Sequence, residues 1–534
     1  MVTTYGSGAS AVLLRGGKIW TGNPRAPRAE ALLWYGSSLE AVGSEEEVRQ
    51  HPLASKAQVV SLRGETVLPG MTDAHAHLGF YAKQRSALPL DQCSSLDEVK
   101  TLIRQRSALV GPDAWICGVR FNDTRWAENR LPTRQDLDSM DIPNPVLLSR
   151  VCCHVQVANS RGLLLAGFAP DAAPTGILYE GDGDPVVQAV ERDRKPEAYL
   201  RCLQEVCQEY TSYGVTSVHT CSAGSYGLGD DLATYQSMLL AGTLPLRIVF
   251  YTDDMPPPGF LSGLGNEWVR FGGFKLFLDG SLGGHTAALS APYADDPSTT
   301  GMFNHETRAL IATMREAHRR GFQMEIHAIG DAALDQAIEA LGALRDLGPC
   351  RAALPHRVNH VMICRPDQLE PLRALGVILD VQPVFVPGEI DMATARLGRE
   401  RLSWAYPWKT FVDGGFVVTG SSDCPVEMPT PWRGIWGAVC RTDEAGNPAG
   451  GWIPEQKLSL DEALTLFTVN PALAVGEGRR RGRLAPGFLA DVVVCGEDLF
   501  ALSPDKLKDV LPRATLVGGR LASGELEGVE RLSA

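Results

Sequence analysis

The chain has 534 residues with a mean hydropathy of −0.07, and 44% of them are apolar, which is typical of a globular protein with a large core. No 18-residue apolar stretch and no export signal are visible, so we expect a cytoplasmic protein without a transmembrane helix. The net charge of −13 argues against nucleic acid or an anionic membrane as a partner, because both require a basic surface.

Both ends of the chain contain short apolar segments that alternate with Gly-, Pro- or charge-rich breaks, a pattern typical of β-strands. The N-terminal segments are 11–14, 18–20, 31–35, 59–62 and 66–68, and the C-terminal ones are 487–494 and 514–517. Neither set is large enough to bury a core alone. We therefore expect one composite β-sandwich domain, formed by residues 1–68 together with 483–534.

Residues 69–482 alternate between strand and helix patterns, which indicates βαβ units and a parallel sheet. After the opening strand, the strand patterns lie at 215–219, 246–251, 273–278, 323–327, 357–363, 377–381 and 416–420. Eight strands with intervening helices predict an α/β fold of the (β/α)₈ TIM-barrel type, whose active site lies at the C-terminal ends of the strands.

Sequence signals also mark helix ends within this region. Ser95 and Ser459 are each followed three residues later by glutamate, so we expect both to open helices as capping boxes. Gly321 and Gly376 are expected to end the helices that begin near Glu306 and Pro366. The stretch from about 80 to 200 is too long for one crossover and contains strand patterns of its own. It is predicted to be an inserted lid subdomain over the barrel mouth.

The first barrel strand ends in His75 and His77. Side chains alternate along a strand, so both imidazoles point to the same side and are well placed to bind a divalent metal. An isolated pair of this kind also occurs as ordinary core or surface histidines. The 12 cysteines form no Cys-x-x-Cys pair and are expected to be reduced, buried thiols.

Four further residues of metal-ligand type lie in or just after later strands: Lys275, His327, His360 and Asp423. Lys275 could be a snorkelling or ion-paired lysine. Alternatively, burial lowers a lysine's pKa, and the neutral amine captures CO₂ to form a carbamate that bridges two metals. Six such residues near strand ends, in the order of the strands, favour a metal site over coincidence.

The chain resembles the metal-dependent amidohydrolase superfamily, most closely the amidohydrolase 3 branch that includes N-substituted formamide deformylase-like enzymes. The resemblance runs from Ile19-Trp20-Thr21-Gly22 to Gly482-Arg483-Leu484-Ala485-Pro486-Gly487. Its most specific motifs are the segments 69–77 (PGMTDAHAH), 275–283 (KLFLDGSLG), 327–331 (HAIGD) and 420–426 (GSSDCPV).

The resemblance implies a binuclear centre with two divalent ions, which we expect to be zinc. His75, His77 and Asp423 would bind one ion, His327 and His360 the other, and carbamylated Lys275 would bridge them. It also implies a small-molecule substrate and is compatible with a homodimer.

Further candidates for contact with substrate have open alternatives. His154 matches a histidine of the family's inserted segment, although a structural role is equally compatible. His219 ends the second strand and could line the pocket or be a satisfied core histidine. Trp126 could form an apolar wall or belong to a core.

Two departures from the family pattern concern His285 and Asn359. The chain has Gly284-His285-Thr286 where members commonly have Ser-Arg-Thr, which puts an imidazole near the mouth. It has Val358-Asn359-His360 where members often have Ile-Glu-His.

The predicted reaction is hydrolysis of a non-peptide C–N bond, of the amide or N-formyl type. Divalent ions lower the pKa of water to about 7, and Asp423 would accept its proton and deliver it to the leaving nitrogen. The alternatives are a deaminase of a cyclic amidine on the same scaffold, a non-catalytic binding protein, and a barrel glycosidase. Lys275 argues against the deaminase, and the complete ligand set argues against the other two.

Overall fold

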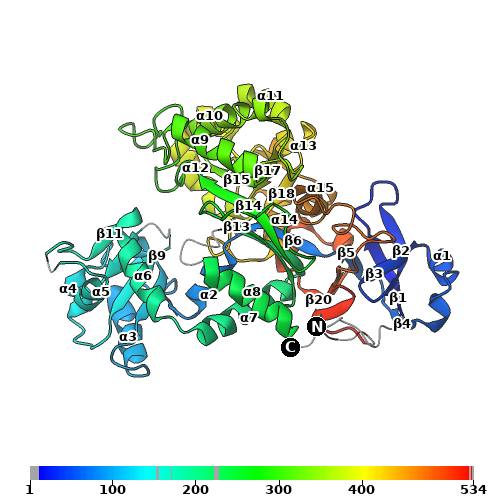
Figure 1. The fold of residues 1–534 in the computed structure, drawn as a ribbon, viewed down its shortest axis with the longest axis horizontal. Helices are drawn as coiled ribbons and strands as arrows, with labels where there is room; N and C mark the ends of the chain where they lie inside the picture. Colours follow the sequence, from blue (N-terminus) through cyan, green and yellow to red (C-terminus); the bar gives the residue numbers. More distant parts are fainter. Residues whose placement is uncertain are drawn as a thin grey trace. The chain divides into compact units, whose positions relative to one another are not determined.

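A computed structural model describes residues 11–151, 155–169, 171–221 and 228–527, together with Val529 and Arg531 (Figure 1). The chain divides into two compact units. The first contains the residues up to Leu78 and those from Cys207 onward, and the second contains Gly79–Val206. In the part of the chain that the structure describes, no helix is long and apolar enough to cross a membrane.

A parallel eight-stranded sheet forms the centre of the first unit and has the order β18-β17-β16-β15-β14-β13-β12-β6. The strands are β6 (Met71–Ala76), β12 (Val215–Thr220), β13 (Arg247–Thr252), β14 (Val269–Phe277), β15 (Gln323–Ala328), β16 (Arg357–His360), β17 (Ile378–Val381) and β18 (Val418–Gly420). Nearly every residue in them is buried, as expected for a parallel sheet that is covered on both faces.

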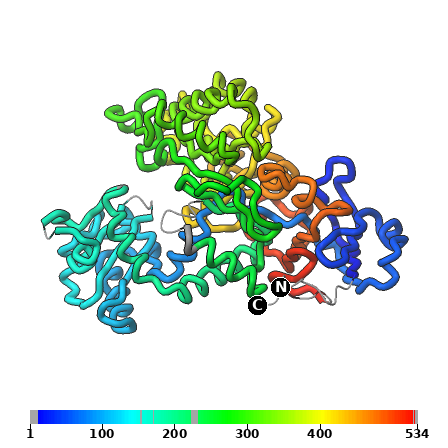
Figure 2. The backbone as a smooth tube through the Cα atoms, viewed as in Figure 1, coloured from blue at the N-terminus to red at the C-terminus, as the bar shows by residue number. Residues whose placement is uncertain are grey.

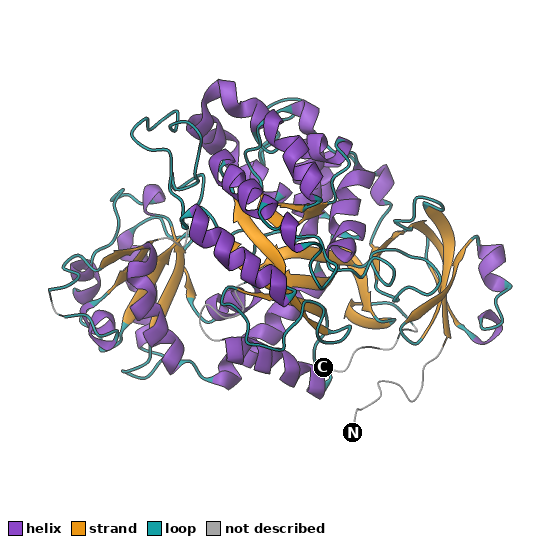
Figure 3. Cartoon of the chain, turned by 45° about the horizontal axis from the view of Figure 1, so that its top comes forward, coloured by secondary structure: helices purple, strands orange, loops and turns teal. Residues whose placement is uncertain are grey.

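Helices connect these strands and surround them (Figure 3). They are α7 (Pro196–Ser212), α8 (Leu228–Ala241), α9 (Thr307–Arg320), α10 (Asp331–Gly342), α11 (Pro366–Leu375), α12 (Val386–Arg401), α13 (Trp408–Asp413), α14 (Pro431–Cys440), α15 (Leu460–Phe467) and α16 (Val469–Ala474). The arrangement is the TIM-like (β/α)₈ barrel that the strand–helix alternation predicts.

The segment after β18 brings the two ends of the barrel sheet together. The Asp423 N–H donates to the His75 carbonyl at 2.9 Å, and the His77 N–H donates to the Cys424 carbonyl at 2.8 Å. The Asp73 carboxylate accepts from the Ser422 backbone N–H at 2.9 Å. These bonds fasten the end of β18 to β6, so the sheet is nearly closed and the first and last strands contribute to the same site.

A second eight-stranded sheet in this unit combines strands from both ends of the chain. Its order is β21-β20-β19-β5-β1-β2-β3, and β4 pairs with β1. The strands are β1 (Ala11–Trp20), β2 (Arg28–Tyr35), β3 (Ser38–Gly43), β4 (Gln58–Ser61), β5 (Thr66–Pro69), β19 (Val492–Cys495), β20 (Pro512–Val517) and β21 (Arg520–Gly524). Figure 2 shows the blue and red ends of the chain side by side where β5 pairs with β19. The short helix α1 (Glu45–Arg49) follows β3.

Strand β1 explains how this sheet buries its core. The sequence predicts two strands, but the structure has one, with an irregularity at Gly16, whose φ is +75°. Val12 and Leu14 belong to one apolar cluster, and Ala11 and Leu13 belong to another. Both faces of β1 are therefore covered. Hydrogen bonding places all eight strands in one sheet, so the description of this domain as a sandwich remains a prediction. The domain boundaries also remain predictions, namely 1–68, 69–482 and 483–534.

The second unit has its own sheet, in the order β11-β10-β9-β8-β7, and its own apolar core. Its strands are β7 (Leu88–Pro89), β8 (Ile116–Phe121), β9 (Val146–Arg150), β10 (Val155–Ala158) and β11 (Ile177–Tyr179). Its helices are α2 (Leu78–Arg85), α3 (Leu96–Ser107), α4 (Arg134–Asp138), α5 (Ser160–Leu165) and α6 (Asp184–Asp193). Its predicted role as a lid remains a prediction.

Several expected element ends agree with the structure. Gly321 and Gly376 end α9 and α11 with φ values of +85° and +64°. Ser459 forms a reciprocal capping box with Glu462. Ser95 caps α3, but its box is incomplete, because the Glu98 carboxylate accepts from the Ser94 N–H instead.

Three predicted strands are too long: those expected over 487–494 and 416–420 begin only at Val492 and Val418, and a third ends early. The strand expected over 357–363 stops at His360, because the backbone turns left-handed there, with φ values of +71° at His360 and +43° at Val361.

Candidate metal centre

The two histidines of β6 converge on one carboxylate. The Nε2 atoms of His75 and His77 lie 3.3 and 3.2 Å from the same oxygen, Asp423 Oδ1. Asp423 reaches this position through a left-handed backbone, with a φ of +56°, immediately after β18. Strand alternation brings His75 and His77 to one side, and barrel closure brings them together with Asp423, about 350 positions later in the sequence.

Asp423 Oδ1 provides a test of whether a metal fits this site. The oxygen is buried, and among the described residues it has no hydrogen-bond partner, although two imidazole nitrogens face it. A buried polar atom without a partner is costly. A divalent ion held between Asp423, His75 and His77 would satisfy the oxygen and both nitrogens, so the donor set fits a metal.

His327 and His360 form a second pair next to the first. Their ring centroids are 4.4 Å apart, and His360 lies 5.4 Å from His75. His360 Nδ1 donates to Gln382 Oε1 at 2.8 Å, which leaves Nε2 with the lone pair. His327 Nε2 is 3.1 Å from the Gly280 carbonyl, so that nitrogen is the donor and Nδ1 carries the lone pair. Both imidazoles are thus in tautomers that can bind a cation.

Lys275 lies in the same group of side chains and is 1% exposed, so it does not snorkel to solvent. Its Nζ donates to Asn359 Oδ1 at 2.8 Å and lies 4.9 Å from the centre of the Phe277 ring. It forms no ion pair with any carboxylate that the structure describes. Strand register places Lys275 among these side chains. Lys275 on β14 pairs with Glu325 on β15, and two residues further along β15 His327 pairs with Asn359 on β16.

Burial and neighbouring charges determine the protonation of the site. Although burial raises the pKa of Asp423, the two imidazole nitrogens that face its oxygen hold that pKa well below its usual range, which favours the carboxylate form. Burial and the neighbouring His327 lower the pKa of His360 well below its usual range, which keeps that imidazole neutral. Anionic carboxylate and neutral imidazole are the forms that bind metal.

Two residues that the sequence did not single out, Glu325 and Cys221, contact His75 from the side away from Asp423. Glu325 Oε1 is 3.3 Å from His75 Nδ1, and Cys221 Sγ is 3.2 Å from the same nitrogen. Glu325 lies two residues before His327 on β15. Because side chains alternate along a strand, this spacing indicates that both residues face the site. Cys221 directly follows β12, and no sequence pattern identified it.

The other residues that were predicted to contact substrate lie in different parts of the fold. His219 is fully buried, with Nδ1 3.4 Å from the Arg357 guanidinium, and among the described residues its Nε2 has no hydrogen-bond partner. His285 is partly exposed on the loop after β14, where its Nε2 is 3.2 Å from Asp295 Oδ1. Trp126 is buried in the core of the second unit, 5.4 Å from Phe121. His154 lies outside the described residues.

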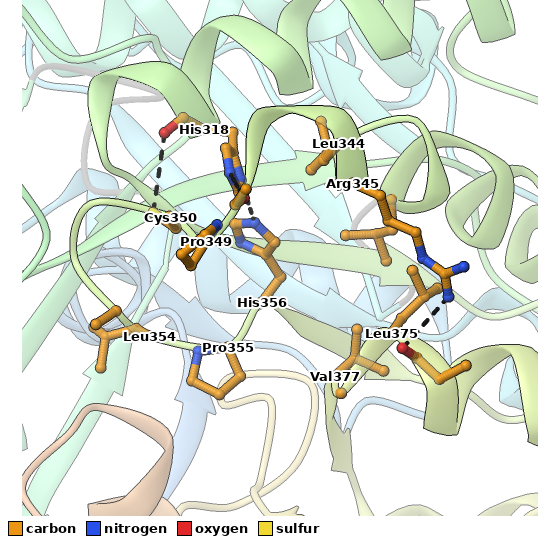
Figure 4. Close-up of a pocket in the computed structure, with 15 residues that line it drawn as sticks. His318, Leu344, Arg345, Pro349, Cys350, Leu354, Pro355, His356, Leu375 and Val377 are labelled. Atoms are coloured by element: carbon orange, nitrogen blue, oxygen red, sulfur yellow. Dashed lines mark hydrogen bonds between the residues drawn. The ribbon is translucent and has the colours of Figure 1, made fainter.

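A separate pocket of about 400 Å³ lies at the other end of the barrel strands (Figure 4). It is bounded by the residues that precede β16 and β17, including Pro355, His356 and Val377, and by the C-terminal ends of α9, α10 and α11. The histidine–carboxylate group lies instead at the C-terminal ends of the strands, which is the catalytic end of a TIM barrel.

The fold and this group of side chains define a barrel enzyme with a site for divalent metal. The family model described as "Amidohydrolase family" matches residues 58–522. The chain belongs to this family and is a hydrolase that acts on C–N bonds.

Similarity to individual relatives extends over nearly the whole chain. "Putative amidohydrolase YtcJ" of Bacillus subtilis is 28% identical over 95% of this chain and 98% of its own. "N-substituted formamide deformylase" of Arthrobacter pascens is 27% identical over 92% of this chain and 94% of its own. Among solved structures, a metal-dependent hydrolase of Pyrococcus horikoshii is similar with a TM-score of 0.80 and 29% identity, covering 93% of this chain and 99% of its own.

Proposed function

We propose that this protein hydrolyses an amide or N-formyl bond of a small molecule at a binuclear centre, with Asp423 as general base. The observation that carries the proposal is the buried Asp423 Oδ1, which faces two imidazole nitrogens at 3.2 and 3.3 Å and has no hydrogen-bond partner among the described residues. The similarity to an N-substituted formamide deformylase supports the substrate class.

In this proposal His75, His77 and Asp423 would hold one ion, His327 and His360 would hold the other, and carbamylated Lys275 would be a ligand shared by both. Three or four nitrogen ligands together with carboxylates suit zinc. When bound, such ions lower the pKa of water to about 7 and polarise a carbonyl.

Asp423 performs the proton transfers. Its lowered pKa favours the ionised carboxylate, which would accept the proton of the attacking water. The same oxygen then returns that proton to the nitrogen of the leaving group, and the C–N bond breaks. The hydrogen bond from the Asp423 N–H to the His75 carbonyl helps to keep the carboxylate in place during both transfers.

A deaminase acting on a cyclic amidine is the second candidate, because it uses the same scaffold. The buried Lys275 favours the hydrolase, since its charge acts on His75 and His360, one residue of each histidine pair, and no described carboxylate holds it in an ion pair. Two metal ions per chain would support the hydrolase, and one ion with release of ammonia would support the deaminase.

The test is a substrate screen on metal-loaded protein, with metal content measured in parallel. Formamides, N-acyl amino acids, ureas and cyclic amides would be offered at neutral pH. We expect turnover of a formamide or N-acyl compound that disappears on chelation and returns when zinc is added. Hydrolysis that survives chelation would contradict the proposal.

A further inference from the structure

The Glu325 carboxylate is a fully buried anion that contacts His75. Its Oε1 is 3.3 Å from His75 Nδ1, and its Oε2 accepts from the Cys221 thiol at 2.7 Å. This environment is closed to solvent, because Glu325, His75 and Cys221 are each at most 3% exposed. The proposed mechanism does not use Glu325.

The proton on His75 determines what Glu325 can do. His75 Nε2 faces Asp423 and His77, so it needs its lone pair if it is to bind an ion. The proton must then be on Nδ1. Two atoms lie within reach of Nδ1, namely Glu325 Oε1 and Cys221 Sγ. The carboxylate is the stronger acceptor, and the thiol already donates to it.

Other donors hold the Glu325 carboxylate in this orientation. Asn359 Nδ2 donates to its Oε1 at 2.9 Å, and the Arg357 guanidinium lies 3.2 Å from the same oxygen. Arg357 is itself fixed by Asp380 at 2.9 Å and by the Ala74 carbonyl at 2.6 Å. The carboxylate therefore cannot turn away from His75 without breaking several buried bonds.

We propose that Glu325 is a positioning residue that holds His75 in the Nε2 lone-pair tautomer and so determines how tightly the site binds metal. Cys221 assists by donating to the far oxygen of Glu325. The inference rests on the proposed metal centre. Carboxylates that accept from a ligand histidine raise its basicity, and losing one typically costs about 10- to 100-fold in metal affinity.

Asp380 offers a matched control for Glu325. Both carboxylates are fully buried, both are ion-paired with Arg357, and both accept from Asn359 Nδ2. Only Glu325 contacts a site histidine. Glu325→Gln and Asp380→Asn therefore each remove one buried charge and keep an amide oxygen, and they differ in whether the acceptor that faces His75 loses its charge.

The experiment measures the zinc dissociation constant of the full-length wild type and of both variants by competition with a chromophoric chelator, after their folding is checked by thermal unfolding. We expect Glu325→Gln to bind zinc about 10- to 100-fold more weakly, and Asp380→Asn to bind within about threefold of the wild type. Equal weakening in both variants would show a general structural effect and overturn the proposal. Unchanged affinity in Glu325→Gln would also overturn it.

A second pair of variants tests the positioning role of Glu325 if Glu325→Gln does not fold. Cys221→Ser keeps a donor to Glu325 and should retain zinc affinity, whereas Cys221→Ala should weaken it by about three- to tenfold, the value of one hydrogen bond. Equal affinities in the two variants would contradict the proposal.

The visible absorption of the cobalt-loaded wild type tests the main rival, in which Cys221 is itself a ligand. A sulfur-to-cobalt charge-transfer band that disappears in Cys221→Ser would overturn the positioning role, and a spectrum without that band supports it. Failure of the wild type to bind zinc would remove the proposed centre and this inference with it. Tight binding in both wild type and Glu325→Gln would remove the inference alone.

Discussion

Asp423 is the residue on which the proposed chemistry depends most directly, and its variant gives the first prediction. Asp423→Asn keeps the size of the side chain and an oxygen ligand but cannot accept a proton. We expect the variant to retain most of its metal and to lose at least about 100-fold in kcat, the usual contribution of a general base. Steady-state kinetics with metal analysis would check this, and near-normal kcat would contradict the base assignment.

Lys275 gives a second prediction at this scale. Lys275→Met keeps an apolar stem of similar length but removes the amine that would form the carbamate. We expect metal content to fall from two ions per chain toward one, because the remaining histidine pairs lose their shared bridging ligand. Two ions bound by the variant at wild-type affinity would contradict the bridging role.

The residues around Lys275 also show what the sequence could and could not predict. Strand order and alternation were sufficient to nominate all six ligand candidates, and the structure brings them together. The role of Asn359 was not predictable, because it depends on three partners from three other strands, β14, β15 and β17. Its amide accepts from Lys275 and donates to both Glu325 and Asp380. A glutamate at this position could not donate to those two carboxylates.

At the scale of elements, a pair of histidines joins the end of α9, the start of β15 and the segment before β16. The Met324 N–H donates to His356 Nδ1 at 3.0 Å, so the proton of the neutral ring is on Nε2. That nitrogen donates to His318 Nδ1 at 3.0 Å, and His318 Nε2 donates to the Gly348 carbonyl at 2.9 Å. The dashed line between the two rings in Figure 4 marks this contact. With one proton on each ring, each of these three hydrogen bonds has one donor and one acceptor.

This arrangement predicts acid sensitivity. Burial and the neighbouring His318 lower the pKa of His356 to about 3. The unfolded chain binds the proton more readily, near pH 6.5. The contribution of His356 to the free energy of unfolding is therefore complete above pH 6.5 and is lost progressively as the pH falls toward 3. At pH 5 the loss is about 2 kcal/mol.

Thermal unfolding of wild type and His356→Asn at pH 8 and pH 5 would test this prediction. Asparagine can accept from the Met324 N–H but does not titrate in this range. We expect the variant to be less stable at pH 8 and to lose less stability than the wild type between pH 8 and pH 5. An equal loss in both proteins would assign the acid sensitivity to other groups.

Element boundaries were predictable where the signal was local. Gly321, Gly376 and Ser459 mark helix ends through their own backbone preferences or side chains. The early end of β16 at His360 was not predictable, because apolar residues continue through Ile363 and only the left-handed backbone at His360 and Val361 stops the strand. The same turn orients the His360 imidazole, so the deviation from the strand pattern coincides with the site.

At the scale of the whole molecule, the barrel and the sheet formed by the chain ends are joined by a buried ion pair. Arg247, the first residue of β13, donates from Nε and a terminal nitrogen to the two oxygens of Asp491 at 2.8 and 2.9 Å. Asp491 directly precedes β19 and also accepts from the Gly518 N–H at 2.8 Å. The sequence placed these residues in different domains and could not pair them, because 244 positions separate them.

The last prediction concerns the folding unit that this pair creates. Asp491→Asn removes the closer charge partner of the buried Arg247 guanidinium and leaves it the Glu267 carboxylate at 3.9 Å. Breaking a buried pair in this way costs up to about 3–5 kcal/mol. Because the pair joins the two sheets, we expect the barrel and the end sheet to unfold in one transition whose midpoint falls in the variant. The double variant Arg247→Met with Asp491→Leu removes both charges and should recover much of the loss, since apolar replacement of a buried pair is often nearly neutral. Calorimetry would distinguish the outcomes: if Asp491→Asn leaves the main transition in place and only a small separate one moves, then the sheet of the chain ends folds independently of the barrel.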